Sequence, residues 1–460
     1  MIGVILSVAT ILRLINLDQS LWLDEATQAI LSSNSIQSII FGRMGDFHPP
    51  LSYIIYHYWM MFGSSEVWLR SLSVIFGVAT VWLIYKIVKK IYSENIALTA
   101  SLLFAFAPYH IYYSQEIRMY SMATFFATLS ILFLINLEKR ISRFGYIIST
   151  LALIYTFYLG FFLLLSQLAF VFLLKKNHLK LFVESLGLIL FLYIPWLPFF
   201  WIQLKNGVNA NQYLPGWGDL LSLSPISAIP LTFIKFSLGR ISFDDKFLYG
   251  ILALIIFIFF GFLIFQSIKK DPKIKLFVIW LTIPVILALS ISFVIPLNQP
   301  FRLLFVLPAF YIILAVGIWQ LGEKKKYVLI AALLPSLFGL AVYFTNPKFE
   351  REDWRGATYF LNSRKDANYK VLFVWPEPFP PYIWYGGKNG IGLVKKFPAS
   401  VVEINQSLDN LQNNQVYLFE YLQGLSDRQK NTQRALIKNG YKLLQVYNFN
   451  GVGFVDLYQR

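Results

Sequence analysis

Long stretches without a charged side chain recur along the first three quarters of this chain. A transmembrane helix needs about 20 mainly apolar residues, and the uncharged windows approach or exceed that length. The windows are Asn95–Gln115, Met119–Leu137, Phe247–Ile268, Leu276–Phe301, Leu303–Gly322 and Tyr327–Pro347. Three segments with a single charged residue each are added as spans: the N-terminal stretch to Leu17, Val67–Tyr85 and Leu181–Leu204. The sequence therefore predicts an α-helical polytopic membrane protein.

The composition excludes the common soluble classes. Only 14% of the residues are charged and 57% are hydrophobic, whereas soluble domains carry about 25% charged residues. A cytosolic globule and a disordered chain are both excluded. The chain has no cysteine, which also excludes disulfides, thiolate zinc sites and cysteine nucleophiles.

Charge placement decides how one ambiguous window crosses the membrane. At about 1.5 Å per residue, Phe144–Leu174 reaches roughly 46 Å, too long for one untilted helix and short for two. If it is a hairpin that bends near Gly160, the basic residues gather in alternate connections, which the positive-inside rule places in the cytoplasm. These residues are Lys86, Lys89, Lys90, Lys139, Arg140, Arg143, Lys175, Lys176, Lys180, Lys269, Lys270, Lys273, Lys275, Lys324, Lys325 and Lys326. A single crossing would put the two later clusters on the wrong side.

We therefore predict about eleven transmembrane helices, a cytoplasmic N-terminus and an extracytoplasmic C-terminus. The net charge of +16 is then a topology signal, and no nucleic-acid partner is expected. We assign residues 1–345 to a transmembrane domain with outer loops 18–66 and 205–246. Residues 346–460 are assigned to a small extracytoplasmic α/β domain.

Local patterns predict the elements outside the membrane. Ala26–Phe41 has the spacing of a short amphipathic helix on the membrane surface, and Pro225–Leu238 could lie along the interface. In the tail, Glu352–Asn362 is helical in pattern and Ser426 is the expected cap of a helix that stops at Gly440. Strands are expected at Tyr369–Trp375, Val416–Tyr421, Tyr441–Tyr447 and Val452–Tyr458.

The ionisable residues outside the basic connections are few, and on this topology they all face outward. Those that could carry chemistry are Asp24, Glu25, Asp46, His48, Glu116, Arg118 and Arg302. A carboxylate can remove a proton from a hydroxyl, and guanidinium groups can hold a phosphate through forked hydrogen bonds. A second carboxylate could hold a divalent cation. The set indicates group transfer from a lipid phosphate.

Each of these residues also has a structural interpretation. Asp24 and Glu25 could be solvated boundary residues, although an acidic pair beside Trp22 and Leu23 is costly without partners. His48, which precedes two prolines, could be a turn residue. Arg118 and Arg302 could anchor spans to lipid headgroups, and Glu116 could pair with Arg118.

The absence of nucleotide-binding motifs narrows the class of sugar donor. No Gly-rich phosphate loop follows a predicted strand and no Asp-x-Asp occurs, which disfavours a soluble nucleotide-sugar donor. Apart from Glu184 near a span end, the spans lack the carboxylates of an ion path.

Several motifs, in order along nearly the whole chain, resemble the membrane glycosyltransferases of the GT-C fold. The nearest group is that of the relatives of protein O-mannosyltransferases and of the aminoarabinose transferase of lipid A. The motifs are Leu-Trp-Leu-Asp-Glu-Ala at 21–26, His-Pro-Pro-Leu at 48–51, Ser-Gln-Glu-Ile-Arg-Met-Tyr-Ser at 114–121, Phe-Arg-Leu-Leu-Phe-Val-Leu-Pro-Ala at 301–309 and Asp-Trp-Arg-Gly-Ala at 353–357.

The resemblance implies an inverting enzyme that uses a polyprenyl-phosphate sugar. By position, Asp24 is the general base and Glu25 its neighbour, while Arg118 and Arg302 contact the donor phosphate. The cavity-lining residues are Asp46, His48, Glu116 and Tyr120. Phe47 stands where some relatives carry an acidic metal ligand, so a divalent cation stays an open question. The tail resembles the family's periplasmic domain, whose role is acceptor recognition or packing on the catalytic face.

The sequence thus predicts a multi-pass glycosyltransferase of the cell membrane. It moves a sugar to an extracytoplasmic hydroxyl on a lipid, a glycan or a protein. One alternative is a transporter or flippase of lipid-linked sugars, which would share the arginines but would not need an acidic pair. A second is a non-catalytic scaffold for envelope assembly.

Overall fold

The computed structural model describes residues 1–41, 46–213, 216, 224–295, 297–364, 368–397, 399–409 and 411–460. The chain divides into two compact units. The helical unit comprises Met1–Leu17, Ser35–Leu204 and Leu221–Asn346; the α/β unit comprises Asp18–Asn34, Lys205–Leu220 and Pro347–Arg460. The predicted first outer loop, 18–66, is thus shared between the units, and part of the second, 205–246, lies outside the described residues.

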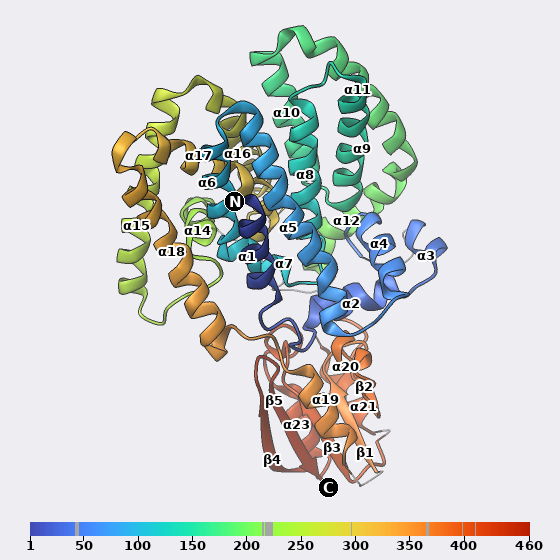
Figure 1. The fold of residues 1–460 in the computed structure, drawn as a ribbon. Coiled ribbons are helices and arrows are strands. Elements are labelled where there is room, and N and C mark those ends of the chain that lie inside the picture. The colour runs from blue at the N-terminus through green and yellow to red at the C-terminus, as the bar shows by residue number, and fades with distance from the viewer. Residues whose placement is uncertain are drawn as a thin grey trace. The chain divides into compact units, whose positions relative to one another are not determined.

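The helical unit is a bundle of α-helices with short 3₁₀ turns (Figure 1). Its helices are α1 (Ile2–Leu14), α3 (Ile36–Ile40), α4 (Leu51–Met60), α5 (Glu66–Ile91), α6 (Glu94–Ala105), α7 (Pro108–Ser114), α8 (Tyr120–Leu134), α9 (Arg140–Thr156), α10 (Gly160–Leu174), α11 (Leu179–Tyr193), α12 (Leu197–Tyr213, which continues into the α/β unit), α14 (Pro225–Leu238), α15 (Lys246–Lys270), α16 (Lys275–Ile291), α17 (Leu307–Trp319) and α18 (Lys325–Thr345). The 3₁₀ turns are η1 (Lys176–His178), η2 (Ile194–Trp196), η3 (Pro272–Ile274), η4 (Pro300–Val306) and η5 (Gly322–Lys324).

The bundle contains segments long and apolar enough to cross a membrane. In the described part of the chain there are 6 such helical segments, or up to 7 when α6 and α7 are counted as one bent span. Shorter apolar helices include α1, α8 and α10. The chain is thus a multi-pass membrane protein, and the finer count of eleven crossings stays a prediction.

The predicted window Asn95–Gln115 is not one straight helix. It breaks between α6 and α7, whose axes differ by 62°. Pro108 is the first residue of α7 and Ala107 before it is extended, because a proline disfavours helical backbone in the residue that precedes it. The break allows the segment after α7 to turn back into the bundle.

The ambiguous window 144–174 folds as two helices, α9 and α10, separated at residues 157–159. The Tyr146 hydroxyl donates to Gln167 Oε1 at 2.9 Å, and Gly160 lies so close to Leu153 that a Cβ there would be 2.7 Å from the leucine Cγ. The first contact is far from the break on both sides, and the second is next to it. The two helices are therefore antiparallel, and the chain reverses next to Gly160 as the hairpin interpretation requires.

The basic connections meet at one end of the helical unit. His178 Nδ1 lies 3.5 Å from the Glu138 carboxylate, and Lys90 lies within electrostatic reach of Lys139. The Lys270 ammonium donates to the Gln320 carbonyl at 3.3 Å. Connections that are distant in sequence thus gather together, as expected if they share one side of the membrane.

The α/β unit is built on a mixed sheet with strand order β2-β1-β3-β5-β4. β1 pairs in parallel with β2 and β3, whereas β5 pairs antiparallel with β3 and β4. The elements are α2 (Leu23–Ser32), η6 (Pro347–Phe349), α19 (Trp354–Asn362), β1 (Tyr369–Phe373), α20 (Pro380–Trp384), β2 (Gly390–Gly392), α21 (Val401–Asp409), β3 (Gln415–Phe419), α22 (Gln423–Ser426), α23 (Asn431–Lys438), β4 (Lys442–Phe449) and β5 (Gly453–Gln459).

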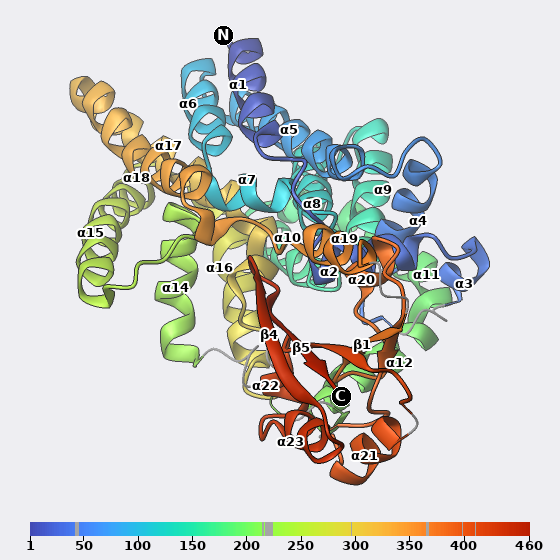
Figure 2. The ribbon, with the colours of Figure 1, turned by 90° about the horizontal axis from the view of Figure 1, so that it is seen from below.

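Alternation along the strands divides the core of this unit in two. Val371 and Phe373 of β1 pack with Trp354 of α19 on one face, and Leu372 packs with Leu436 of α23 on the other. Successive side chains of a strand point to opposite faces, so helices can cover both. Figure 2 shows α19 and α20 on one side of the sheet and α21 and α23 on the other.

Some predicted elements differ from the observed ones. The predicted helix Ala26–Phe41 is two helices, α2 and α3, with Ser35 as the N-cap of α3. The prediction that Ser426 caps the last helix is wrong: the Asp427 carboxylate accepts from the backbone N–H groups of Asn431 and Thr432 at 2.9 and 2.8 Å. Aspartate accepts such bonds well because its carboxylate is charged.

Candidate active site

The link between α7 and α8 carries the first group of predicted site residues. Glu116 and Arg118 are 1% and 6% exposed, although both are charged. Both lie in the five-residue stretch 115–119 that joins the two helices. Burial of charged groups is costly unless other charges or hydrogen bonds compensate it, so this short link is held in a polar environment inside the bundle.

A buried arginine in α1 fixes the start of this link. The Arg13 guanidinium donates to the carbonyls of Ala9 and Ala105 at 2.9 and 3.2 Å, and lies 3.0 Å from His110 Nδ1. The Ala105 carbonyl is at the end of α6, where helical carbonyls lack partners. Gln115 in turn donates to the Ile15 carbonyl at 2.8 Å. His110 therefore helps to hold the buried Arg13 in place.

The two predicted phosphate-binding arginines meet around one tyrosine. The Arg118 guanidinium lies 6.0 Å from the Tyr120 ring centroid, and Arg302 lies within electrostatic reach of Tyr120. Tyr120 contacts Phe301 with ring centroids 5.4 Å apart, and Arg302 lies over the Phe301 ring at 5.7 Å. We call these two arginines and Tyr120 the arginine cluster.

Asp46 and His48 lie next to this cluster. The Asp46 carboxylate is 3.1 Å from His48 Nδ1. Burial would raise the pKa of Asp46, but His48, its hydrogen bond and the Arg118 charge outweigh burial and hold the pKa below its ordinary value. Asp46 is therefore ionised at neutral pH. The structure brings Arg118, Arg302, Tyr120, Asp46 and His48 together in the helical unit.

Three polar residues that the sequence did not indicate support His48. Gln203 of α12 donates to the His48 carbonyl at 3.1 Å and accepts from the Tyr158 hydroxyl. Trp196 donates to the same hydroxyl at 3.0 Å. Tyr158 lies at the turn between α9 and α10, so this turn lies at the same end of the helical unit as Asp46 and His48. A single polar residue in an apolar segment forms no pattern, so the sequence did not mark these three as site residues.

Arg240 is a further cation that the sequence analysis passed over. It follows α14 and donates to the Tyr112 hydroxyl, with its guanidinium 4.7 Å from the Tyr112 ring centroid. Tyr109 and Tyr113 each lie within electrostatic reach of both Arg240 and Glu116. The only available signal was its position in the predicted second outer loop.

The predicted catalytic acids, Asp24 and Glu25, belong to the α/β unit. They occupy the first turn of α2, where the helix dipole favours negative charge. Glu25 is fully buried and Asp24 is half-buried. The segment before α2 is held by the Leu21 backbone N–H, which donates to the Tyr385 hydroxyl at 2.7 Å. Asp24 is therefore the more accessible of the two carboxylates.

A third carboxylate, Glu352, lies within electrostatic reach of Asp24. It accepts hydrogen bonds from Trp354 Nε1 at 2.7 Å and from the Tyr421 hydroxyl at 3.0 Å. Burial, and to a smaller extent the Asp24 charge, raises the pKa of Glu352 against the lowering effect of these bonds. Glu352 directly precedes the Asp-Trp-Arg-Gly-Ala motif but was not singled out from the sequence.

No group of three or more His, Asp or Glu side chains that could hold a metal ion occurs in the described ranges of the chain. We therefore derive no chemical step through a metal.

Comparisons with known proteins bear on the fold of the chain. Residues 47–201 match the family described as dolichyl-phosphate-mannose-protein mannosyltransferase. A solved structure of ArnT from Cupriavidus metallidurans in the apo state superimposes with a TM-score of 0.63 at 12% identity, over 99% of this chain and 97% of that one. The chain has the GT-C glycosyltransferase fold.

Two ligand-bound structures share this GT-C fold. ArnT from Cupriavidus metallidurans bound to undecaprenyl phosphate matches with a TM-score of 0.58 at 13% identity, covering 99% of this chain and 97% of that chain. The second is the oligosaccharyltransferase AglB from Archaeoglobus fulgidus in complex with an inhibitory peptide and a dolichol-phosphate. It matches with a TM-score of 0.57 at 12% identity, covering 99% of this chain and 74% of that chain. No curated protein matches the sequence.

Proposed function

We propose that this GT-C protein is an inverting glycosyltransferase that uses a polyprenyl-phosphate sugar as donor. The observation that carries the proposal is the arginine cluster, in which Arg118 and Arg302 share Tyr120 at one end of the helical unit. Forked guanidinium groups match phosphate oxygens. Two of the solved relatives are described as bound to polyprenyl phosphates.

In the proposed reaction a carboxylate removes the proton and the arginines hold the leaving phosphate. The Asp24 carboxylate takes the proton of an acceptor hydroxyl, and the acceptor oxygen forms a bond to the anomeric carbon of the sugar. The bond between that carbon and the donor phosphate oxygen breaks, and polyprenyl phosphate leaves with its added negative charge held by Arg118 and Arg302. Attack from the face opposite the phosphate inverts the anomeric configuration.

Glu25 and Glu352 are proposed to tune Asp24, and Asp46, His48 and Glu116 to line the donor side. The Asp46–His48 pair beside Arg118 would keep that guanidinium oriented. For the α/β unit we propose acceptor recognition, because it carries α2 and therefore Asp24.

We propose that the protein lies in the cell membrane with eleven crossings, the N-terminus in the cytoplasm and the arginine cluster on the outer side. The antiparallel α9–α10 hairpin and the gathering of the basic connections at one end support this topology. The direction of α5, α8 and α10 also supports it, since each begins near the cluster end and ends at the basic end.

The experiment that tests the function is a transfer assay with purified, reconstituted protein and a polyprenyl-phosphate sugar. We expect a glycosylated acceptor whose anomeric configuration, read by NMR, is opposite to that of the donor. Mass spectrometry of envelope glycans with and without the gene would supply the candidate acceptors. Movement of the lipid-linked sugar across the bilayer without product would contradict the proposal and favour a flippase.

A further inference from the structure

A cavity of about 430 Å³ lies at the basic end of the helical unit, remote from the arginine cluster. Its apolar wall comes from the ends of three helices that begin near the cluster: Ile91 ends α5, Leu134 ends α8 and Leu174 ends α10. At 1.5 Å per residue, α8 alone separates Tyr120 from Leu134 by about 21 Å. The cavity is therefore distinct from the candidate active site.

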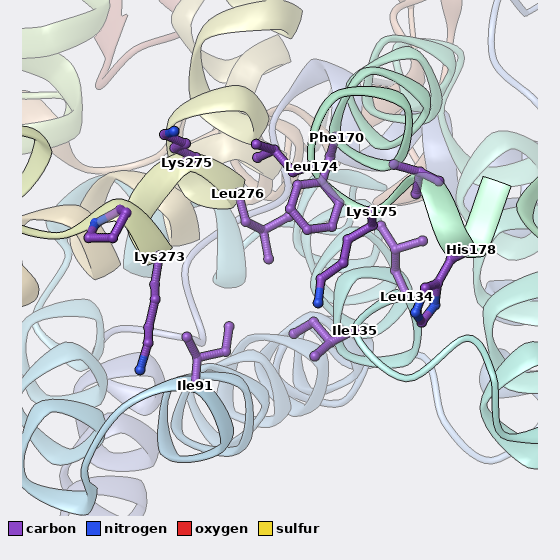
Figure 3. A pocket seen from close by; sticks show the side chains of 12 residues that line it. Ile91, Leu134, Ile135, Phe170, Leu174, Lys175, His178, Lys273, Lys275 and Leu276 are labelled. Carbon is purple, nitrogen blue, oxygen red and sulfur yellow. The ribbon is translucent and has the colours of Figure 1, made fainter.

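The cavity combines an apolar wall with a cationic rim. Lys175, Lys273 and Lys275 line it together with His178. Figure 3 shows Lys273 and Lys175 flanking the apolar side chains of Leu276 and Phe170. In the described part of the chain, no Asp or Glu lines the cavity, and no ion pair or side-chain hydrogen bond engages the three lysine ammonium groups.

Two carboxylates close to the cavity already have partners. Glu138 lies 3.5 Å from His178 Nδ1, and the Asp271 carboxylate accepts the backbone N–H of Lys273 at 2.8 Å as the cap of η3. Three ammonium groups around one opening attract an anion with several acceptor oxygens, and a phosphate is the simplest such group.

The wall indicates that the anion has a hydrocarbon tail. Phe170, Val171 and Leu276 are buried at the cavity. Phe172 and Leu173, next to the lining residue Leu174, are 55% and 60% exposed. Exposed apolar side chains on a membrane helix face lipid chains, so lipid-facing side chains lie in sequence directly beside the lining residue Leu174. A free phosphate would leave this apolar wall uncovered, whereas an amphiphile would bury it.

We propose that this cavity, here called the lysine pocket, binds the headgroup of an anionic glycerophospholipid of the cytoplasmic leaflet. The lysines hold the phosphate diester and the acyl chains follow the exposed face of α10. The assignment of the leaflet rests on the proposed topology, but the binding does not depend on glycosyl transfer.

The test compares two triple variants that remove the same charge. In one, K175A/K273A/K275A empties the rim of the lysine pocket; in the other, K324A/K325A/K326A removes three lysines of the last basic connection, which do not line it. Full-length protein is purified in detergent and titrated with phosphatidylglycerol, with binding read by native mass spectrometry. Phosphatidylcholine and inorganic phosphate serve as the other probes.

We expect the pocket variant to bind phosphatidylglycerol at least tenfold more weakly, and the control variant to bind it as the unmodified chain does. Equal loss in both variants would mean a diffuse charge effect and would overturn the pocket. Competition by inorganic phosphate as effective as by phosphatidylglycerol would replace the lipid by a free anion.

Two further measurements control for misfolding of the triple variant. Undecaprenyl phosphate binding at the arginine cluster should be unchanged in the pocket variant, which checks that it is folded and separates this inference from the proposed function. K273E, a single exposed change, should weaken phosphatidylglycerol binding by itself. Unaltered phosphatidylglycerol binding in both K273E and the pocket variant would exclude the site.

Discussion

The two units of this protein carry opposite chemistry. In the helical unit the predicted site residues are mainly cationic and aromatic. Arg118 and Arg302 both lie near Tyr120, and Asp46 is held ionised beside Arg118. In the α/β unit they are carboxylates, Asp24 and Glu25, joined by Glu352. This difference underlies the proposed division of labour, in which one unit binds the donor phosphate and the other takes the acceptor proton.

The largest expected effect is that of removing the proposed base. Asp24→Asn should lower turnover by about 10²–10⁴, because general-base catalysis typically contributes that factor, while donor affinity is unchanged. The measurement is sugar transfer by reconstituted protein, alongside donor binding. Asp409→Asn, an exposed change in the same unit, is the matched control. Loss of donor affinity in the Asp24 variant, with turnover at saturation retained, would break the division of labour.

Glu352→Gln should have a smaller effect on the same side of the comparison. The neutral side chain can still accept from Trp354 and Tyr421 but no longer carries charge near Asp24. Because Asp24 itself is retained, we expect turnover to change far less than on removal of the base, by less than about tenfold. The pKa of Glu352 is raised above its ordinary 4.5, so one titration above pH 4.5 should disappear from the pH–rate profile. An identical profile would separate Glu352 from the chemistry.

Arg13→Leu tests whether every buried arginine of the helical unit binds donor. Arg13 holds the Ala105 carbonyl and His110, and each buried acceptor left without a donor costs about 1–3 kcal/mol. We expect a lower thermal midpoint in detergent, with donor affinity falling only as far as the link at 115–119 loosens. Arg140→Leu, at an exposed position, is the control. Full thermal stability combined with lost donor binding would instead place Arg13 in the binding site.

The smallest effect is expected at a carboxylate of the α/β unit that has no proposed role in transfer. Burial and, to a smaller extent, Glu420 raise the pKa of Asp456 from 3.8 to about 6, although Lys430 opposes this. Because the folded-state pKa is the higher one, the stabilising contribution is complete below about pH 4 and is lost as the pH rises through 6.

Asp456→Asn should therefore raise the thermal midpoint of the full chain slightly at pH 8, and the gain should vanish near pH 4. Transfer activity should be unaffected at either pH. A variant that gains stability at pH 4 but not at pH 8 would reverse the sign and contradict the raised pKa.

The sequence predicted those features that depend on local pattern and on charge. The reversal near Gly160 followed from the basic residues on both sides of it, and four strands of the sheet followed from alternation. The strand β2 was missed because Gly390–Gly392 is too short to show any period. The cap was assigned to Ser426 rather than to Asp427 as observed, because the sequence pattern does not fix where α23 begins.

The candidate site was predicted less completely, for a physical reason. Arg118, Arg302 and His48 stood out because charge is rare in apolar sequence. Gln203 and Tyr158 support His48 through contacts between residues far apart in the chain, which no local pattern encodes. The same holds for the assignment of Asp18–Asn34 to the α/β unit, since it depends on contacts such as that of Leu21 with Tyr385.

The most direct test of the central claim is the affinity of the purified protein for undecaprenyl phosphate in three single variants. A hydrogen bond to a charged group contributes about 1.5–3 kcal/mol, and 1.4 kcal/mol is tenfold in affinity. Arg118→Ala and Arg302→Ala should therefore each bind at least about tenfold more weakly, while Arg140→Ala binds as tightly as the unmodified chain. If the first two variants keep full affinity, the arginine cluster does not hold the donor phosphate and the account is wrong.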